Sequence, residues 1–362
     1  MLVRVTAVTG GLGAALAVSM VLAANIGTEP VPLAVIVDSA RSYLAELIGR
    51  LEGRGMSAGM VDAIRRYLMR PPLTTEPQLA YIFWNLRLPR VVLGSVVGMA
   101  LTVAGGSLQG LLMNPLADPY LVGVSAGAAL GASAGIVLHV SDFAGGAGQS
   151  LIAFASGALT MALVLWLARS QRRIQRDSFI LAGVVVGSFM WALVTLLMTM
   201  AGRDLQSVVF FLMGSLHRQD LDWGIVGVAA LMVGVGCVWL YTYARDLNVL
   251  ALGEEQARQL GVETEQLKIG VILASALITA AAVSVSGIIG FVGLVMPHIA
   301  RKLFGPDHRV LLPAAGLLGA SFLVWTDTLA RAIGETFPVG VLTALLGAPF
   351  FFYLLKTRAR AA

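Results

Sequence analysis

Residues 91–117 read VVLGSVVGMALTVAGGSLQGLLMNPLA and carry no charged side chain. After the single charge of Asp118, residues 119–141 are again uncharged, and after Asp142 the same holds for residues 143–168. A helix needs about 20 apolar residues to cross a hydrocarbon core of about 30 Å, and each of these windows has that length. This stretch therefore predicts three consecutive transmembrane helices.

The same pattern continues in both directions along the chain. The long window near the C-terminal third contains glycines and a proline, which would divide it into two helices. The first window is longer than the apolar core of a signal peptide, so we expect a retained helix. Together the windows predict an all-α, polytopic membrane protein with about ten transmembrane helices. The further windows are residues 5–28, 178–202, 223–244, 269–300, 310–326 and 336–355.

The composition agrees with this class and excludes others. Of the 362 residues, 57% are hydrophobic and 12% are charged, whereas soluble domains carry about 25% charge. A soluble enzyme and a disordered chain are both excluded. The net charge of +5 is explained by basic cytoplasmic loops rather than by nucleic-acid binding. The single cysteine, Cys237, permits no internal disulfide, and the four histidines show no metal-ligand spacing.

The basic residues also predict the orientation of the chain. Four arginines lie in the loop at 169–176, and a second basic loop follows residue 300. With ten helices, both termini and the loop at 245–268 are then cytoplasmic. We expect one transmembrane domain over residues 1–362, with its first helix at 5–28, an extended external loop at 29–87, and helices two to ten within 88–357. Val61–Met69 is predicted as an amphipathic helix on the outer surface.

Three arginines lie where this orientation rule does not favour them. Arg87 and Arg90 precede the second helix, and Arg331 ends the ninth, all on the external side. Two interpretations stay open: these side chains reach lipid headgroups, or they form a basic rim that receives an acidic partner. Asp327 lies one helical turn before Arg331, so the two can also pair within the membrane edge.

The loop at 245–268 has the pattern of a short amphipathic helix bounded by Gly253 and Gly261. Such an element fits the groove of a partner protein, or it rests on the membrane surface. The turn at 114–119 is interpreted as structural, and the small residues at 123–135 as a close helix-packing face. None of the three lysines ends a phosphate-binding loop, so the chain is not expected to hold ATP itself.

Five blocks of the sequence resemble the iron-chelate and cobalamin permeases of ATP-driven importers. In chain order they are LRLPR, LQGLLMNPLADPYLVGVSAGA, LALGEEQARQLGV, GIIGFVGLVMPHIARKLFGPDHRVLLP and FPVGVLTALLGAPFFFYLL, at residues 86–90, 108–128, 250–262, 287–313 and 337–355. The resemblance implies the type II ABC importer permease fold, with two copies of the chain enclosing one translocation path. It further implies two ATP-binding cassette subunits on the cytoplasmic face and a substrate-binding protein outside. Neither a cofactor nor a catalytic residue is implied for the permease itself.

The resemblance also assigns roles to residues. The residues that it implies for docking of the binding protein are Arg87, Arg90 and Arg331. The residues that seat in the ATPase groove are Leu250, Gly253, Glu254, Ala257, Arg258 and Gly261. Helices at 178–201 and 337–355 would line the path, with Met190 and Met198 as soft path residues. At the inner gate, small hydroxyl residues of the cobalamin permeases are replaced here by Arg176 and Asp177.

These observations predict a permease subunit that imports a bulky metal chelate, either a ferric siderophore or haem, across a bacterial or archaeal cytoplasmic membrane. A cobalamin importer is the alternative within the same family. Two other classes remain: an ion-coupled secondary carrier, which would depend on Asp327, and a membrane-anchored receptor or scaffold. Membrane lipid is expected around the chain, and no nucleic acid.

Overall fold

The computed structural model describes residues 2–27, 31–32, 34–38, 40–41, 77–140, 147–170, 173–218, 221–334 and 336–359. Most of the predicted external loop, including the predicted helix at Val61–Met69, lies outside these residues.

Ten helices of the described residues build the body of the molecule, in agreement with the predicted number. They are α1 (Leu2–Asn25), α5 (Leu88–Leu111), α6 (Val124–Val137), α7 (Gly148–Ala168), α8 (Arg176–Met200), α10 (Trp223–Thr242), α13 (Thr264–Ser286), α14 (Val292–Phe304), α15 (His308–Ile333) and α16 (Val339–Ala359). Seven of the described helices are long and apolar enough to cross a membrane. The all-α prediction is confirmed.

Shorter elements connect these helices. They are α4 (Pro77–Tyr81), a π-helical segment (Ile82–Arg87), two 3-10 turns (Pro119–Val122 and Gly202–Asp204), α9 (Leu205–Leu212), α11 (Ala244–Leu250) and α12 (Glu254–Gln259). A two-residue antiparallel hairpin, β1 (Arg169–Ser170) with β2 (Arg173–Ile174), joins α7 to α8.

The predicted division of the window at 269–300 is confirmed. The helix α13 ends at Gly287, whose φ of +67° belongs to the left-handed region, and α14 starts after Phe291, whose φ is +68°. Glycine adopts such angles without steric cost, whereas Phe291 does so as part of a tightly held break.

Three boundaries differ from the prediction. The second helix begins at residue 77 rather than at 88, because α4 and the π-helical segment run without interruption into α5. The external loop is correspondingly shorter. The window at 119–141 forms a helix only at Val124–Val137, because Pro119 starts a 3-10 turn and Gly123 adopts a left-handed φ of 82°. The helix α9 (Leu205–Leu212), between α8 and α10, was not predicted.

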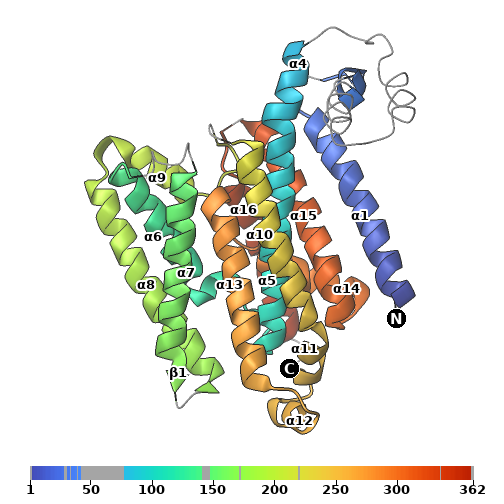
Figure 1. The fold of residues 1–362 in the computed structure, drawn as a ribbon, viewed down its shortest axis with the longest axis vertical. Helices are drawn as coiled ribbons and strands as arrows, with labels where there is room; N and C mark the ends of the chain where they lie inside the picture. Colours follow the sequence, from blue (N-terminus) through green and yellow to red (C-terminus); the bar gives the residue numbers. More distant parts are fainter. Residues whose placement is uncertain are drawn as a thin grey trace, which may run out of the picture.

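The central helix is α5, which is enclosed by α10, α13, α14 and α15 (Figure 1). Glycines permit its closest approaches: a Cβ at Gly98 would overlap the backbone of Gly319 in α15, and a Cβ at Gly105 would overlap the backbone of Gly293 in α14. Small residues are the means by which membrane helices pack closely without a hydrophobic drive.

The helices α6 to α9 form a second group beside this core, at the left of Figure 1. Here a Cβ at Gly127 would overlap Thr160, and a Cβ at Gly131 would overlap Ser156, both on α7. The predicted packing face at 123–135 is therefore confirmed.

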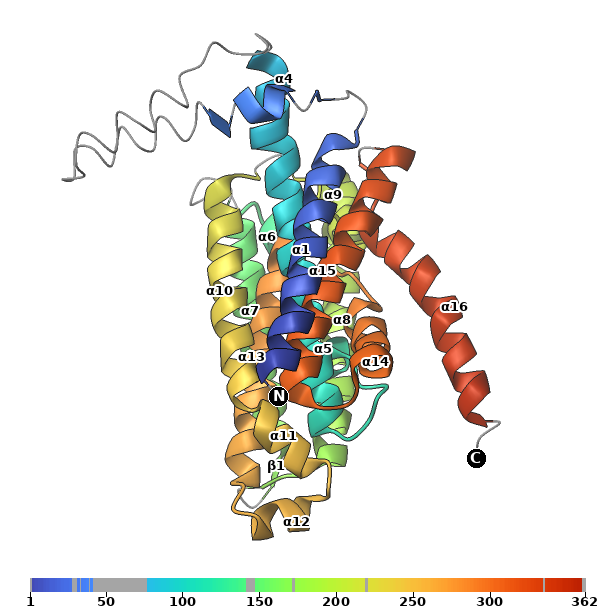
Figure 2. The same ribbon diagram turned by 90° about the vertical axis from the view of Figure 1, so that its right-hand side faces the viewer.

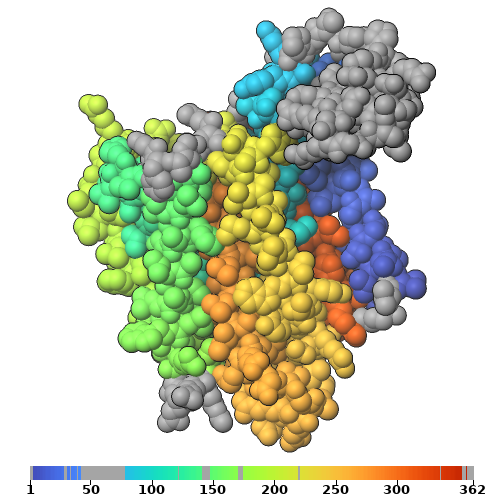
Figure 3. Space-filling model, in the orientation of Figure 1, coloured from blue at the N-terminus to red at the C-terminus, as the bar shows by residue number. Residues whose placement is uncertain are grey.

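The two ends of the bundle differ in what they present (Figure 2). One end, here named the α4 end, carries α4, α9 and the C-terminal end of α1. The opposite end, named the α12 end, carries α11, α12, the hairpin and the described beginning and end of the chain. The short helix α12 lies at the bottom of the body in the space-filling view (Figure 3), below α11. The helix α16 leans away from the bundle in Figure 2.

Candidate functional site

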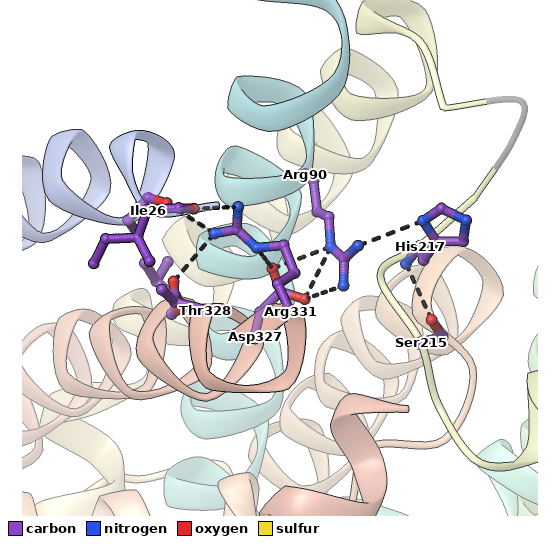
Figure 4. Close-up of polar contacts among 9 residues, drawn as sticks. Ile26, Arg90, Ser215, His217, Asp327, Thr328 and Arg331 are labelled. Carbon is purple, nitrogen blue, oxygen red and sulfur yellow. Dashed lines mark hydrogen bonds and ion pairs between the residues drawn. The ribbon is translucent and has the colours of Figure 1, made fainter. Parts of the chain in front are cut away.

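At the α4 end, arginines surround one buried aspartate (Figure 4). The Nε atom of Arg90 donates to both carboxylate oxygens of Asp327, at 3.0 and 3.1 Å, and its Nη2 donates to Oδ1 at 2.8 Å. Arg331 places its Nε 3.3 Å from Oδ2 of the same carboxylate. The side chains of Arg90 and Asp327 are 7% and 2% exposed. Charges so far removed from water are tolerated only when they are paired in this way.

Arg331 also holds the end of the first helix. Its Nη2 donates to the carbonyl of Ala23 at 2.8 Å, and its Nη1 donates to the carbonyl of Ile26 at 3.1 Å. Figure 4 shows the guanidinium turned toward α1. The last carbonyls of a helix have no partner within it, and a cation there is favourable. The guanidinium of Arg87 lies against Gly27, just after the end of α1, where a Cβ atom would overlap it.

The three predicted docking arginines are therefore brought together, and the predicted pairing of Asp327 with Arg331 is confirmed. Arg87 and Arg90 are buried within the chain, and their role in docking a partner stays a prediction. Sequence spacing did not reveal that Arg90 binds Asp327, since 237 residues separate them. His217, whose Nδ1 is 3.4 Å from Nη1 of Arg90 (Figure 4), was also missed.

At the α12 end, Gly253 turns the chain between α11 and α12 with a φ of +123°. This turn places Leu250 and Ala257 inside the fold, where neither is exposed. Both side chains therefore pack within the chain in this structure, and their seating in an ATPase groove stays a prediction. Leu252 and Leu260 face outward instead, with 66% and 64% of their surfaces exposed.

A cluster of charged side chains joins α12 to α13 and the hairpin. The Nζ atom of Lys268 is 2.8 Å from Glu254, 2.9 Å from Glu265 and 3.0 Å from the carbonyl oxygen of Ile174. Arg258 adds a second cation 2.7 Å from Glu254. Two of these residues, Glu254 and Arg258, were predicted site residues.

The charges of this cluster keep Glu254 ionised. Burial opposes ionisation, but the hydrogen bond and charge of Lys268, with the charges of Arg258 and Arg176, lower the pKa of Glu254 below its usual 4.5. Hydrogen bonds and opposite charges favour the ionised form of a carboxyl group.

The predicted gate residues lie beside the predicted coupling residues. Arg176 and Asp177, at the start of α8, line a pocket of about 490 Å³ together with Glu254, Arg258 and Lys268. Lys268 was not predicted as part of any site. The sequence feature that could have indicated it is its position directly before the apolar window at 269–300, in a chain with only three lysines.

Hydrogen bonds of Asn248 join α11 to the start of α15. The Nδ2 atom of Asn248 donates to Asp307 at 2.7 Å, while its Oδ1 accepts from the backbone N–H of His308 at 2.9 Å. His308 is the first residue of α15. The helix that carries Asp327 and Arg331 at the α4 end is thus fixed to α11 at the other end.

The break between α13 and α14 is bonded to Tyr120, in the 3-10 turn that follows residues 114–118. The hydroxyl of Tyr120 donates to the carbonyl of Ile289 at 2.8 Å and accepts from its N–H at 3.0 Å. Asp118 caps the turn by accepting from the N–H of Tyr120 at 2.8 Å. Backbone groups in a membrane must be satisfied within the protein, so the structural interpretation of this turn agrees with the geometry.

Asp118 is expected to make the stability of the protein depend on pH. Burial raises its pKa from 3.8 to about 6, and the hydrogen bond from Tyr120 opposes this rise in part. A folded-state pKa above the unfolded one gives stability that is complete below about pH 4 and lost as the pH rises through about 6. As the pH rises between these values, the unfolding midpoint of the wild type should therefore fall relative to that of Asp118→Asn. The exposed-residue variant Glu255→Gln is the control; if it and Asp118→Asn behave alike, Asp118 is not the titrating group.

The two predicted path helices carry uncovered apolar surface. On α8, Leu181, Val185 and Phe189 are exposed, and on α16 so are Leu345 and Phe352. Met190 and Met198 are half-buried on α8, and Met190 packs against the core.

Within the described ranges, no group of three or more His, Cys, Asp or Glu side chains is placed to hold a metal ion.

Comparison with known proteins identifies the family. A model of the FecCD transport family matches residues 54–357. The chain is 39% identical over 365 residues to a cobalamin import system permease of Halobacterium salinarum, covering 98% of this chain and 97% of that protein. It is 40% identical over 292 residues to a hemin transport system permease of Yersinia pestis, covering 78% and 85%.

The fold comparison agrees. A solved inward-facing ABC transporter of the metal-chelate type superimposes with a TM-score of 0.75 at 29% identity, over 97% of this chain and 99% of that one. A family match over most of the length, a full-length relative and a shared fold give the same assignment. The chain belongs to the FecCD transport family of membrane-embedded ABC importer permeases.

Proposed function

We propose that two copies of this chain form the translocation path of an ATP-driven importer for a bulky metal chelate. The observation that carries the proposal is the family match over residues 54–357, combined with an arginine cluster at one end of the bundle and a projecting helix pair at the other. Cobalamin and haem, the cargoes named for two relatives, are the first candidates, and a ferric siderophore is the third.

The arginine cluster is proposed to receive the binding protein. Arg87, Arg90 and Arg331 carry three positive charges and Asp327 carries one negative charge, which leaves a net charge of +2 on the cluster. Although all three arginines are recessed, with the side chain of Arg331 only 8% exposed, the field of such a cluster attracts acidic surfaces over about 10 Å. This end of the bundle is proposed to face the exterior.

The projecting segment of α11 and α12 is proposed to dock into an ATP-binding cassette subunit. Leu252 and Leu260 offer apolar anchors, and Gly253 and Gly261 bound the helix between them. Short helices with exposed apolar residues fit grooves in this manner. Both termini share this end and are proposed to be cytoplasmic.

The exposed apolar faces of α8 and α16 are proposed to meet the second copy of the chain and to line the path, with Met190 and Met198 on α8. Arg176 and Asp177 form the inner gate in this proposal. A carrier driven by ion coupling through Asp327 is disfavoured, because two guanidinium groups hold that carboxylate.

Uptake by reconstituted complexes tests the proposal. Liposomes that contain the permease with its ATPase and binding protein should accumulate one of cobalamin, haem or ferric siderophore when ATP is supplied. Permease alone, and complexes with a hydrolysis-deficient ATPase, are the controls. Concentrative uptake by the permease alone would contradict an ATP-driven importer. Stimulation by the binding protein should weaken with rising salt if the arginine cluster attracts it.

A further inference from the structure

The hairpin between α7 and α8 is held at one residue from two directions. The N–H of Ile174 donates to Oε2 of Glu265 at 2.9 Å, and its carbonyl accepts from Nζ of Lys268 at 3.0 Å. Both side chains come from the first turns of α13. Ile174 itself is buried, and α8 begins two residues later.

The same lysine holds α12. Its Nζ is 2.8 Å from Oε1 of Glu254 and 2.9 Å from Oε1 of Glu265. An ammonium group has three donors, and here each one reaches a different group: the hairpin backbone, α12 and α13. Because the Lys268 side chain is only 7% exposed, these contacts cannot be exchanged for water without cost.

We propose that Lys268 is a positioning residue that makes the hairpin and the start of α8 follow the movement of α12. The inference rests on the proposed function, in which an ATPase moves α12 and α8 lines the path. The sequence of contacts runs from Glu254 through Lys268 to the backbone of Ile174, and from there along the chain to Arg176.

Arg258 of α12 reaches the hairpin only indirectly. It bonds Glu254 and Thr264 at 2.7 and 3.0 Å, and its Nη2 lies 3.9 Å from Oε1 of Glu265, the side chain that accepts from the N–H of Ile174. Lys268 differs from Arg258 because it binds the hairpin backbone directly, at 3.0 Å. Lys268 therefore joins the two segments, with Glu265 fixing the orientation of Ile174.

The first test is the amount of cargo transported per ATP hydrolysed. In the full complex, Lys268→Met should lower this ratio about tenfold, the size of an ordinary coupling energy, while ATP hydrolysis continues. Lys268→Arg retains the charge and several donors and should recover part of the ratio. Lys302→Met, at an exposed lysine of α14 at the same end, is the matched control and should leave it unchanged.

A wild-type ratio in Lys268→Met would overturn the inference, as would an equal loss in Lys302→Met. If Lys268→Met does not assemble, Glu265→Gln replaces it; this variant keeps the pair between Lys268 and Glu254 but weakens the hold on the N–H of Ile174. The same fall in the ratio is expected.

The second test does not require transport. Spin labels at the exposed positions Gln175 and Gln259, in a Cys237→Ala background, report the distance between the hairpin and α12. In the wild-type complex the distribution of this distance should be narrow, and its mean should stay constant when ATP binds. In Lys268→Met the distribution should broaden or its mean should change. Identical distributions in both proteins would overturn the inference. A wild-type complex that shows the expected distances but no ATP-dependent uptake would instead contradict the proposed function.

Discussion

Replacing Asp327 with alanine should lower the free energy of unfolding by about 3–5 kcal/mol, the range measured when one partner of a buried ion pair is removed. The guanidinium groups of Arg90 and Arg331 would lose their shared carboxylate while remaining in side chains that are 7% and 8% exposed. Unfolding of the purified protein in mixed detergent micelles, followed by circular dichroism, measures the change.

The pair of His139 with Asp204, at 3.4 Å and with side chains that are 71% and 35% exposed, provides the control. Asp204→Ala should cost less than about 1 kcal/mol, because water screens a surface pair. The double variant Arg90→Met with Asp327→Leu should regain part of the loss, since both charges of the closest pair are then removed. A cost for Asp327→Ala as small as that for Asp204→Ala would contradict the buried arrangement.

Introducing glutamate at both Leu252 and Leu260 should abolish assembly with the ATPase. Each side chain is an exposed apolar anchor on the projecting segment, and loss of an interface anchor costs about 2 kcal/mol or more, which is about a thirtyfold weaker complex for each anchor. The stability of the isolated permease should change by no more than about 0.5 kcal/mol, because neither residue packs in its core. Co-purification and a titration of ATPase binding give the measurement.

Leu303→Glu is the matched control, because Leu303 is 63% exposed on α14 but does not belong to α11 or α12. It should bind the ATPase as the wild type does. Wild-type binding by the double variant would show that the ATPase docks elsewhere on the permease.

Much of the fold could be predicted from the positions of the charges alone. Apolar windows must lie in the membrane, and the break at Gly287 is visible because glycine and proline interrupt helices. The early start of the second helix and the existence of α9 could not be predicted from uncharged windows. Arg87 and Arg90 interrupt the apolar pattern of the second helix, and the eight residues of α9 are too few to cross a membrane.

The arginine cluster and the cluster around Lys268 were predicted less completely than the fold, because their contacts depend on how helices distant in the sequence pack together. The charge pattern indicated Arg87, Arg90 and Arg331, but their common partner is set by the packing of α15 on α5. The pattern of α11 and α12 indicated a docking element but not which side faces outward, because the left-handed turn at Gly253 redirects the chain. Lys268 was missed because its partners come from three separate segments.

One helix connects the features at the two ends. The 26 residues of α15 span about 39 Å, and about 29 Å of this lies between the backbone N–H of His308, which Asn248 binds, and Asp327, which pairs with the arginines. The contact with Asn248 at one end of the bundle and the arginine cluster at the other are therefore joined by a single helix, with no loop between them.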